Sequence, residues 1–201
     1  MNPSNHFIFA TPILVSNPIY NISKNEIEFI KQIKKGRNIH NGYSLNKFIF
    51  DTTKKLDFIK RYCEKWVEYY AYKILLINPK TKFYITQSWT NYNQKGNTHH
   101  QHDHPNSLIS GIFFIQGKAS TVFYRRHKIF PLEFQHLAHN EVSANRYYFD
   151  LKVGQLCLFP SSLEHSVIEN KFKEERITLA FNTFAKGEFG EADDCVCYLK
   201  L

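Results

Sequence analysis

Apolar residues in the first third of the chain recur every three to four positions, the spacing at which side chains share one face of a helix. The first stretch begins with a capping box at Ser23–Glu26 and predicts a helix over 24–35 that stops at Gly36. The second carries a longer apolar stripe over 55–76. Together they predict a layer of two helices over about 23–78.

From Lys82 onward apolar and polar positions alternate, which is typical of strands with one buried face. Strands are predicted over 83–91, 108–115, 119–124, 146–151, 155–159, 165–169, 175–183 and 195–200. An earlier strand-like stretch over 7–20 contains Pro12 and therefore belongs at a sheet edge. The pattern predicts a mainly β fold, a cupin-like jelly roll (double-stranded β-helix), with an N-terminal two-helix layer. We expect one domain over 1–201, with its jelly-roll core over about 82–201.

Four histidines fall within residues 99–104, directly before a predicted apolar strand. Residues two apart in a strand share a face, so His102 and His104 are expected to point the same way. Non-haem iron sites often combine two histidines with a carboxylate, and here Asp103 is the candidate. The residue two positions before Asp103 is Gln101, which cannot serve as its partner. The pattern therefore predicts a metal site with three histidines and no carboxylate.

The third ligand is expected downstream at His165, which follows a Pro-Ser turn and opens a predicted strand. The other two histidines of the cluster, His99 and His100, are expected at the surface or behind the ligands. Asp103 is expected to cap the next turn or to orient a ligand histidine. The cluster alone could also be a solvated polar tract, so the metal site depends on His165 and on the motif that follows it.

Arg176 follows His165 after a polar segment, 169–174, which is typical of a hairpin turn. Such a turn would bring Arg176 opposite His165 on a neighbouring strand, with Thr178 on the same face as Arg176. A permanently charged guanidinium beside a hydroxyl suits a carboxylate. A metal and a carboxylate site side by side would hold a 2-oxo acid that chelates iron at one end. The alternative is that Arg176 pairs with a neighbouring glutamate.

Three motifs in this order resemble those of the 2-oxoglutarate/Fe(II)-dependent oxygenases of bacteria and phages. They are His-x-His-Pro-Asn-Ser with Ser-Gly and an aromatic pair (102–114), Phe-Pro-Ser-x-x-x-His (159–165), and Glu-Arg-Ile-Thr-x-Ala-Phe-Asn (175–182). The resemblance also includes Phe-Ala-Thr-Pro-Ile (9–13) and the C-terminal segment from 182, so it covers nearly the whole chain. Each motif alone would be weak, but together they are specific.

The resemblance implies an oxygenase that uses Fe(II), 2-oxoglutarate and O2, and we expect a hydroxylase. His102, His104 and His165 would hold the metal, whereas Arg176 and Thr178 would bind 2-oxoglutarate. Further cofactor contacts would come from Asn182, which shares the parity of Arg176, and from Asn91 by analogy with related sites. Ser107, Ser110 and Gly111 are expected to serve turns and close packing.

Two other functions remain open. A cupin-like metalloenzyme could use the three-histidine metal without 2-oxoglutarate. A jelly-roll module could bind a sugar or nucleotide without catalysis, with the histidines merely polar. The substrate could be a small molecule, a protein or a nucleic acid.

Residues 125–145 form a long polar segment between predicted strands, and long loops in compact domains often carry binding residues. This placement makes Tyr124, Arg125 and Arg126 the expected substrate contacts.

The formal net charge of +8 permits an acidic partner, but the lysines are scattered along the chain. No Lys/Arg-rich arm, zinc-finger spacing or RNA-binding aromatic motif supports nucleic acid, which is therefore not favoured. No apolar run reaches membrane-spanning length and no leader precedes the first strand, so we expect a cytoplasmic protein that does not bind membranes. Of four cysteines, Cys63 and Cys157 are expected in the core. Cys195 and Cys197 are expected to alternate in a terminal strand, unless they bind metal or oxidise.

Overall fold

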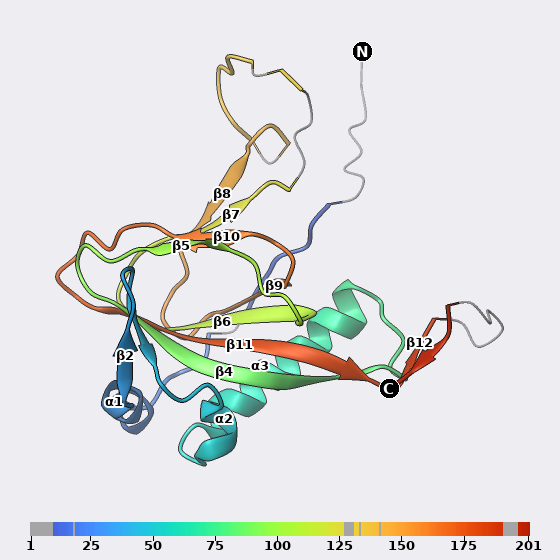
Figure 1. Ribbon diagram of the computed structural model, residues 1–201, viewed down its shortest axis with the longest axis horizontal. Coiled ribbons are helices and arrows are strands. Elements are labelled where there is room, and N and C mark those ends of the chain that lie inside the picture. The colour runs from blue at the N-terminus through green and yellow to red at the C-terminus, as the bar shows by residue number, and fades with distance from the viewer. Residues whose placement is uncertain (1–9, 18, 127–130, 133, 141, 191–196) are drawn as a thin grey trace.

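The computed structural model describes residues 10–17, 19–126, 131–132, 134–140, 142–190 and 197–201. A large antiparallel sheet faces a smaller one (Figure 1). The large sheet contains, in spatial order, β1 (Leu14–Val15), β9 (Leu156–Pro160), β6 (Ile109–Gln116), β11 (Arg176–Lys186), β4 (Lys82–Asn93), β3 (Gly42–Ser44) and β2 (Lys35–Arg37). The small sheet contains β5 (His99–His102), β10 (His165–Val167), β7 (Thr121–Tyr124) and β8 (Arg146–Phe149). The mainly β prediction is confirmed.

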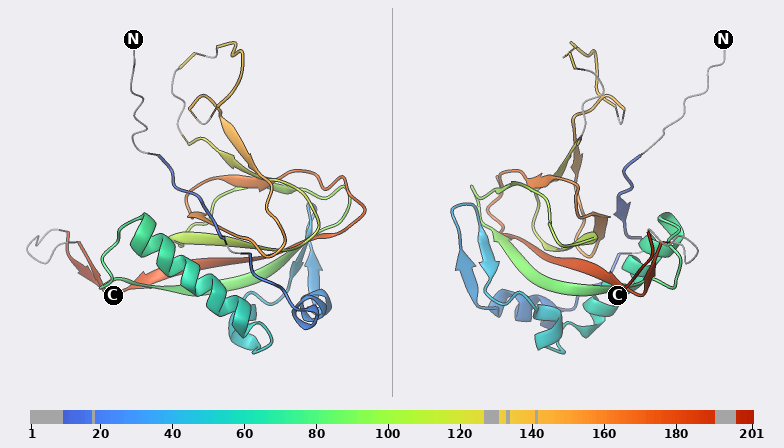
Figure 2. Two further views of the ribbon diagram at one scale, coloured as in Figure 1. Left: turned by 180° about the vertical axis from the view of Figure 1, so that it is seen from behind. Right: turned by 45° about the vertical axis from the view of Figure 1, so that its right-hand side comes forward.

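The helices cover the outer face of the large sheet, on the side away from the small sheet (Figure 2). They are α1 (Lys24–Gln32), α2 (Ile49–Thr52) and α3 (Asp57–Tyr69), and the last continues into a π-helical turn, η1 (Tyr70–Ile74). The capping box of α1 forms as predicted, since Ser23 Oγ accepts from the backbone N–H of Glu26 at 3.2 Å and the Glu26 carboxylate accepts from the Ser23 N–H at 2.8 Å. Gly36 does not end this helix: α1 ends at Gln32, and Gly36 lies in β2.

Most of the apolar core lies between the helices and the large sheet. The predicted stripe of α3 buries Ile59, Cys63 and Val67, which belong to one cluster with Phe113 of β6 and Leu179 of β11. A fully buried side chain of this size contributes about 1.5–3 kcal/mol relative to exposure. Because the helices occupy the outer face, the inner face of β4, β6 and β11 is left for the small sheet and for a site between the sheets.

A second, smaller cluster lies between the two sheets. Its buried members are Ile112, Phe123, Cys157 and Phe159. Cys63 and Cys157 are both fully buried, so the predicted core positions of these two cysteines are confirmed. Beyond this small cluster the cavity between the sheets is lined by polar side chains such as His102, Arg176 and Thr178 as well as by apolar ones such as Trp89 and Val167.

The register of β4, β11 and β6 places residues of these three strands side by side in rows on the face toward the small sheet. On β11, alternate residues from Arg176 to Asn182 face the small sheet. Arg176 pairs with Asn93 of β4. The next three are flanked by β4 and β6: Thr178 lies between Asn91 and Phe114, Ala180 between Trp89 and Ile112, and Asn182 between Gln87 and Ser110. The inner face is therefore polar at both ends and apolar in the middle.

The predicted hairpin between His165 and Arg176 is wrong. Strand β10 pairs with β5 and β7, whereas β11 pairs with β4 and β6, so the segment 168–175 crosses from the small sheet to the large one. A polar segment of this length looks the same in sequence whether it closes a hairpin or connects two sheets. The two residues still lie close, because they face each other across the interior.

The ends of the chain match their predictions only in part. Strand β1 is an edge strand of the large sheet as expected, although it is only two residues long and residues 7–9 lie outside the described range. The predicted last strand is reduced to β13 (Leu199–Lys200), which pairs with β12 (Glu188–Phe189). Cys195 lies outside the described residues, and Cys197 is exposed. Among the helices that the structure describes, none has the length and apolar character needed to cross a membrane.

Candidate metal centre

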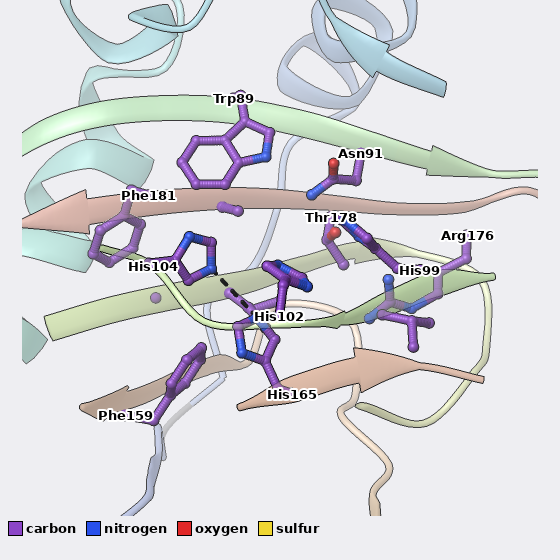
Figure 3. A pocket seen from close by; sticks show the side chains of 14 residues that line it. Trp89, Asn91, His99, His102, His104, Phe159, His165, Arg176, Thr178 and Phe181 are labelled. Carbon is purple, nitrogen blue, oxygen red and sulfur yellow. Dashed lines mark hydrogen bonds between the residues drawn. The ribbon is translucent and has the colours of Figure 1, made fainter. Parts of the chain in front are cut away.

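Three histidines from two segments meet between the sheets (Figure 3). His102 is the last residue of β5 and pairs directly with His165, the first residue of β10. His104 follows two residues after the end of β5. One ring nitrogen from each of the three lies within 4.8 Å of the others, and Nε2 of His104 is 3.4 Å from Nε2 of His165. First-row metal ions bind imidazole nitrogen at about 2.0–2.1 Å, so one ion between these rings is sterically reasonable.

Backbone carbonyls orient two of the rings. Nδ1 of His102 lies 2.8 Å from the carbonyl oxygen of His100, and Nδ1 of His165 lies 3.1 Å from that of Leu163. A carbonyl oxygen can only accept, so each Nδ1 carries the proton and each Nε2 keeps its lone pair. This is the way that metal-binding histidines are held in proteins. The donor set fits a divalent metal ion, and no carboxylate belongs to it.

Burial keeps these imidazoles neutral. Desolvation lowers the pKa of His104 to about 4 and the pKa of His165 well below its usual value, and nearby histidines add to both effects. The pKa of His102 is also lowered, mainly by burial. Neutral imidazole is the form that binds metal, so the site is ready to bind at neutral pH without first losing protons.

These shifts predict that the metal-free protein loses stability in mild acid. Below pH about 6.5 the unfolded chain protonates these histidines, but the folded chain does not until the pH reaches the lowered values. The free energy of unfolding should therefore fall from pH 6.5 toward pH 4, by at most about 1.4 kcal/mol per pH unit for each histidine. Urea unfolding at several pH values measures this slope. His104→Gln should flatten it, and His139→Gln, on an exposed loop, should not.

His99 joins this site, although its parity suggested otherwise. The β5–β10 ladder shifts register between the pair His165/His102 and the pair Val167/His99, so His99 and His102 both turn toward the interior. Their rings stack with centroids 4.6 Å apart. The irregularity in the ladder has no signature in the sequence, which is why alternation alone placed His99 behind the ligands. His100 does remain exposed, as expected.

Arg176 lies at the other end of the same cavity and is 1% exposed. One guanidinium nitrogen donates to Thr121 Oγ1 at 3.2 Å, and the guanidinium lies over the ring of Phe114 at 5.2 Å. Its Nε has no hydrogen-bond partner, and no carboxylate of the described residues forms an ion pair with it. Burial lowers its pKa to about 10. A buried cation without a counter-charge is costly, so the arrangement fits an anionic ligand. The alternative considered for Arg176, an ion pair with a neighbouring glutamate, does not form.

Thr178 and Asn91 flank this cationic end. They are direct neighbours across β11 and β4, both are buried, and both line the cavity. Asn182 shares the face of Arg176 but does not line the cavity. Its side chain accepts a hydrogen bond from Ser110 Oγ at 2.9 Å and donates to Gln87 Oε1 at 3.4 Å. The structure thus brings Arg176, Thr178 and Asn91 together and leaves Asn182 apart from them.

The three residues expected to contact substrate lie elsewhere. The Tyr124 hydroxyl is 2.9 Å from Ser166 Oγ, and the Arg125 guanidinium donates to backbone carbonyls of Ala144 and Val142. None of Tyr124, Arg125 and Arg126 lines the cavity. The loop they begin extends away from both sheets (Figure 1). These hydrogen bonds join Arg125 to the other end of the same loop, so its guanidinium is used within the loop and not in the cavity.

The opposite end of the cavity is apolar. Trp89, Ile112 and Phe159 line it, and the Trp89 ring lies 5.8 Å from the His104 ring. Figure 3 shows His104 between Trp89 and Phe159, with Arg176 on the far side of His102. Asp103 is exposed and takes no part in the histidine group.

Residues 87–182, which contain the whole of this site, match the family described as "Putative 2OG-Fe(II) oxygenase". The chain therefore resembles the 2OG-Fe(II) oxygenase family over the segment that carries the site. The family is named for 2-oxoglutarate and Fe(II) and acts with O2, so the predicted cofactors are confirmed at the level of the family. The residues that hold them stay predictions. No curated protein sequence matches the chain.

Three solved structures, each named with this family or with 2-oxoglutarate, are similar to the chain in fold. An oxidoreductase of the 2OG-Fe(II) oxygenase family from Burkholderia pseudomallei is 8% identical, with a TM-score of 0.59 over 85% of this chain and 83% of that one. HygX from Streptomyces hygroscopicus, with nickel, 2-oxoglutarate and hygromycin B bound, is 9% identical, with a TM-score of 0.58 over 86% and 82%. The 2-oxoglutarate-dependent epimerase SnoN from nogalamycin biosynthesis is 9% identical, with a TM-score of 0.60 over 88% and 79%. These likenesses confirm the double-stranded β-helix fold.

Proposed function

We propose that the chain is an Fe(II)- and 2-oxoglutarate-dependent oxygenase that hydroxylates a small-molecule substrate. The observation that carries the proposal is one cavity with three neutral imidazoles at its centre and a buried, uncompensated arginine at one end. This combination fits a metal and a ligand that is both a metal chelator and an anion. A small molecule is favoured by HygX, whose structure has hygromycin B bound.

The residues have separate tasks in this proposal. His102, His104 and His165 hold iron through Nε2, and the carbonyls of His100 and Leu163 orient the rings of His102 and His165. Arg176 pairs with the far carboxylate of 2-oxoglutarate, assisted by the hydroxyl of Thr178, and Asn91 lies beside them. Iron with 2-oxoglutarate and O2 supplies the oxidising power that converts a C–H bond to an alcohol. The apolar walls at Trp89 and Phe159 exclude water from the side left for substrate.

Anaerobic titration tests the proposal. Fe(II) is added to the metal-free protein and then 2-oxoglutarate, and the visible charge-transfer band of the iron–2-oxoglutarate chelate is recorded. We expect the band to appear with one equivalent of each. If neither Fe(II) nor 2-oxoglutarate binds, the proposal is wrong and the fold serves as a scaffold for another ligand.

The cupin-like alternative retains one specific observation in its favour, because the ligand group contains three histidines and no carboxylate. In that case Fe(II) would bind in the same titration, but 2-oxoglutarate would produce no band. Product analysis by mass spectrometry then separates hydroxylation from other outcomes, such as the epimerisation for which SnoN is named.

A further inference from the structure

We propose that Ser161 is a positioning residue that holds two of the three candidate metal ligands, His104 and His165. It would act through the turn Pro160–Glu164 and through a buried chain of hydroxyl groups. The inference rests on the proposed metal site and goes beyond it, because Ser161 itself contacts no metal.

His104 needs an anchor outside the sheet. Strand β5 ends at His102, so the ladder of the small sheet no longer fixes the backbone at His104. The backbone N–H of His104 instead donates to the carbonyl oxygen of Ser161 at 2.9 Å. A metal ligand that lies beyond the end of its strand depends on such a contact, because a displacement of the backbone moves the ring nitrogen with it.

The same turn also orients His165. The Leu163 carbonyl accepts from Nδ1 of His165 at 3.1 Å, and the Leu163 N–H donates to the Pro160 carbonyl at 2.9 Å. One tight turn thus contacts His104 through its second residue and His165 through its fourth. A shift of this turn would change the distance between the two facing Nε2 atoms, which is 3.4 Å in the structure.

Ser161 fixes the turn to the rest of the fold. Its side chain is 1% exposed, and its Oγ lies 2.7 Å from Ser107 Oγ and 2.8 Å from Ser110 Oγ. Its backbone N–H donates to the Leu108 carbonyl at 3.0 Å. These partners belong to the segment that leads from His104 into β6. Ser161, which lies shortly before His165, is thus bonded to the segment that follows His104.

The hydroxyls form a chain that can run in a single direction. The Thr183 N–H donates to Ser107 Oγ at 3.3 Å, and Ser110 Oγ donates to Asn182 Oδ1 at 2.9 Å. When Ser107 donates to Ser161 at 2.7 Å and not to the Thr183 carbonyl at 3.1 Å, and Ser161 donates to Ser110, each hydroxyl donates once and accepts once. The Thr183 carbonyl still accepts from the Leu108 N–H at 3.0 Å, and buried bonds in series strengthen one another. The chain begins and ends on adjacent residues of β11, at the point where its pairing with β4 shifts register.

This chain of hydroxyl groups assigns a role to motif residues that were predicted from the sequence only as turn or packing positions. Ser107 and Ser110 belong to the first of the three motifs, Ser161 to the second and Asn182 to the third, and the fold joins their side chains by hydrogen bonds. Asn182, which was expected to contact the cofactor, has its side-chain oxygen engaged at the end of this chain instead.

Cobalt binding to the metal-free protein tests the inference, because Co(II) reports both affinity and coordination geometry through its visible d–d bands. We expect Ser161→Ala to bind Co(II) about 10–100-fold more weakly than wild type and to change the intensity of the bands, the usual effect of losing a residue behind a metal ligand. Ser110→Ala removes the next bond along the chain and should cause a smaller loss in the same direction. It carries the test if Ser161→Ala does not fold.

Ser88→Ala is the matched control. Ser88 is also 1% exposed, and its Oγ accepts from the backbone N–H of Phe50 at 2.9 Å, but it belongs to the helical side of the large sheet. It should lower the thermal midpoint and leave Co(II) affinity unchanged. Wild-type affinity in Ser161→Ala, or an equal loss in Ser88→Ala, overturns the inference. Absence of Co(II) binding by the wild type overturns the metal site itself, and that result is seen before any variant is made.

Discussion

Replacing His165 with alanine should abolish stoichiometric binding of Fe(II). His165 is 4% exposed and supplies the Nε2 that lies 3.4 Å from that of His104, and it pairs directly with His102 in the small sheet. With alanine, two imidazoles remain, and both are partly exposed to water. Water then competes for the coordination positions, because no carboxylate of the described residues lies close enough to replace the lost ligand.

Anaerobic equilibrium dialysis with iron analysis measures the effect. We expect one bound Fe(II) per chain for wild type and less than a tenth of that for His165→Ala at the same free iron concentration. His139→Ala provides the matched control, since it removes a histidine from an exposed loop far along the β7–β8 connection. Full iron content in His165→Ala, or an equal loss in His139→Ala, would show that the three-histidine group is not the metal site.

The histidine group was predictable from local pattern, but partly for the wrong reason. Alternation was expected to place His102 and His104 on one face of a strand. In the structure the strand ends at His102, and the contact of His104 with Ser161 brings the two rings together. That contact joins residues 57 positions apart, so no local rule could reveal it. The two rings nevertheless lie with centroids 5.0 Å apart, so the pattern identified residues that do come together.

Arg176 is a second residue that was correctly expected in the site although the predicted link between its strand and that of His165 was wrong. The hairpin expected between β10 and β11 does not exist, yet the crossing between the sheets still places Arg176 in the cavity with His165. Parity along β11 was reliable, because an 11-residue strand in the middle of a sheet alternates with little freedom. It correctly placed Thr178 beside Arg176.

Features that depend on short or irregular pairing were missed. The hairpin of β2 and β3 has three residues in each strand and no clear alternation, and the sequence assigned its glycine to a helix stop. The register shift between β5 and β10 that turns His99 inward also has no signature in the sequence. Trp89 lines the apolar end of the cavity because it pairs with Ala180, whose small side chain leaves room above it. Such relations between strands are set by the whole sheet and not by neighbouring residues.

Replacing Arg176 with methionine should weaken binding of 2-oxoglutarate far more than binding of Fe(II). Methionine keeps most of the buried volume of Arg176 and removes the charge. The three histidines lie outside β11, and His102 and His165 keep their orienting carbonyl contacts. Loss of one partner from a buried charge pair costs about 2–5 kcal/mol, so the affinity should fall at least about 30-fold. The metal-free variant should be as stable as wild type or more stable, because a desolvated charge without a partner is removed.

Titration of the anaerobic Fe(II) protein with 2-oxoglutarate, followed by the charge-transfer band, measures this affinity, and dialysis measures that for Fe(II). Arg61→Met is the matched control, because Arg61 is exposed on α3 on the outer side of the large sheet. Arg176→Lys should recover only part of the affinity, since a lysine ammonium cannot present the two parallel donors of a guanidinium. Equal 2-oxoglutarate affinity in Arg176→Met and wild type would exclude Arg176 as the carboxylate partner. In that case the Arg176 Nε–H, which has no hydrogen-bond partner, would bind another anion. The three-histidine metal group would then favour the cupin-like function.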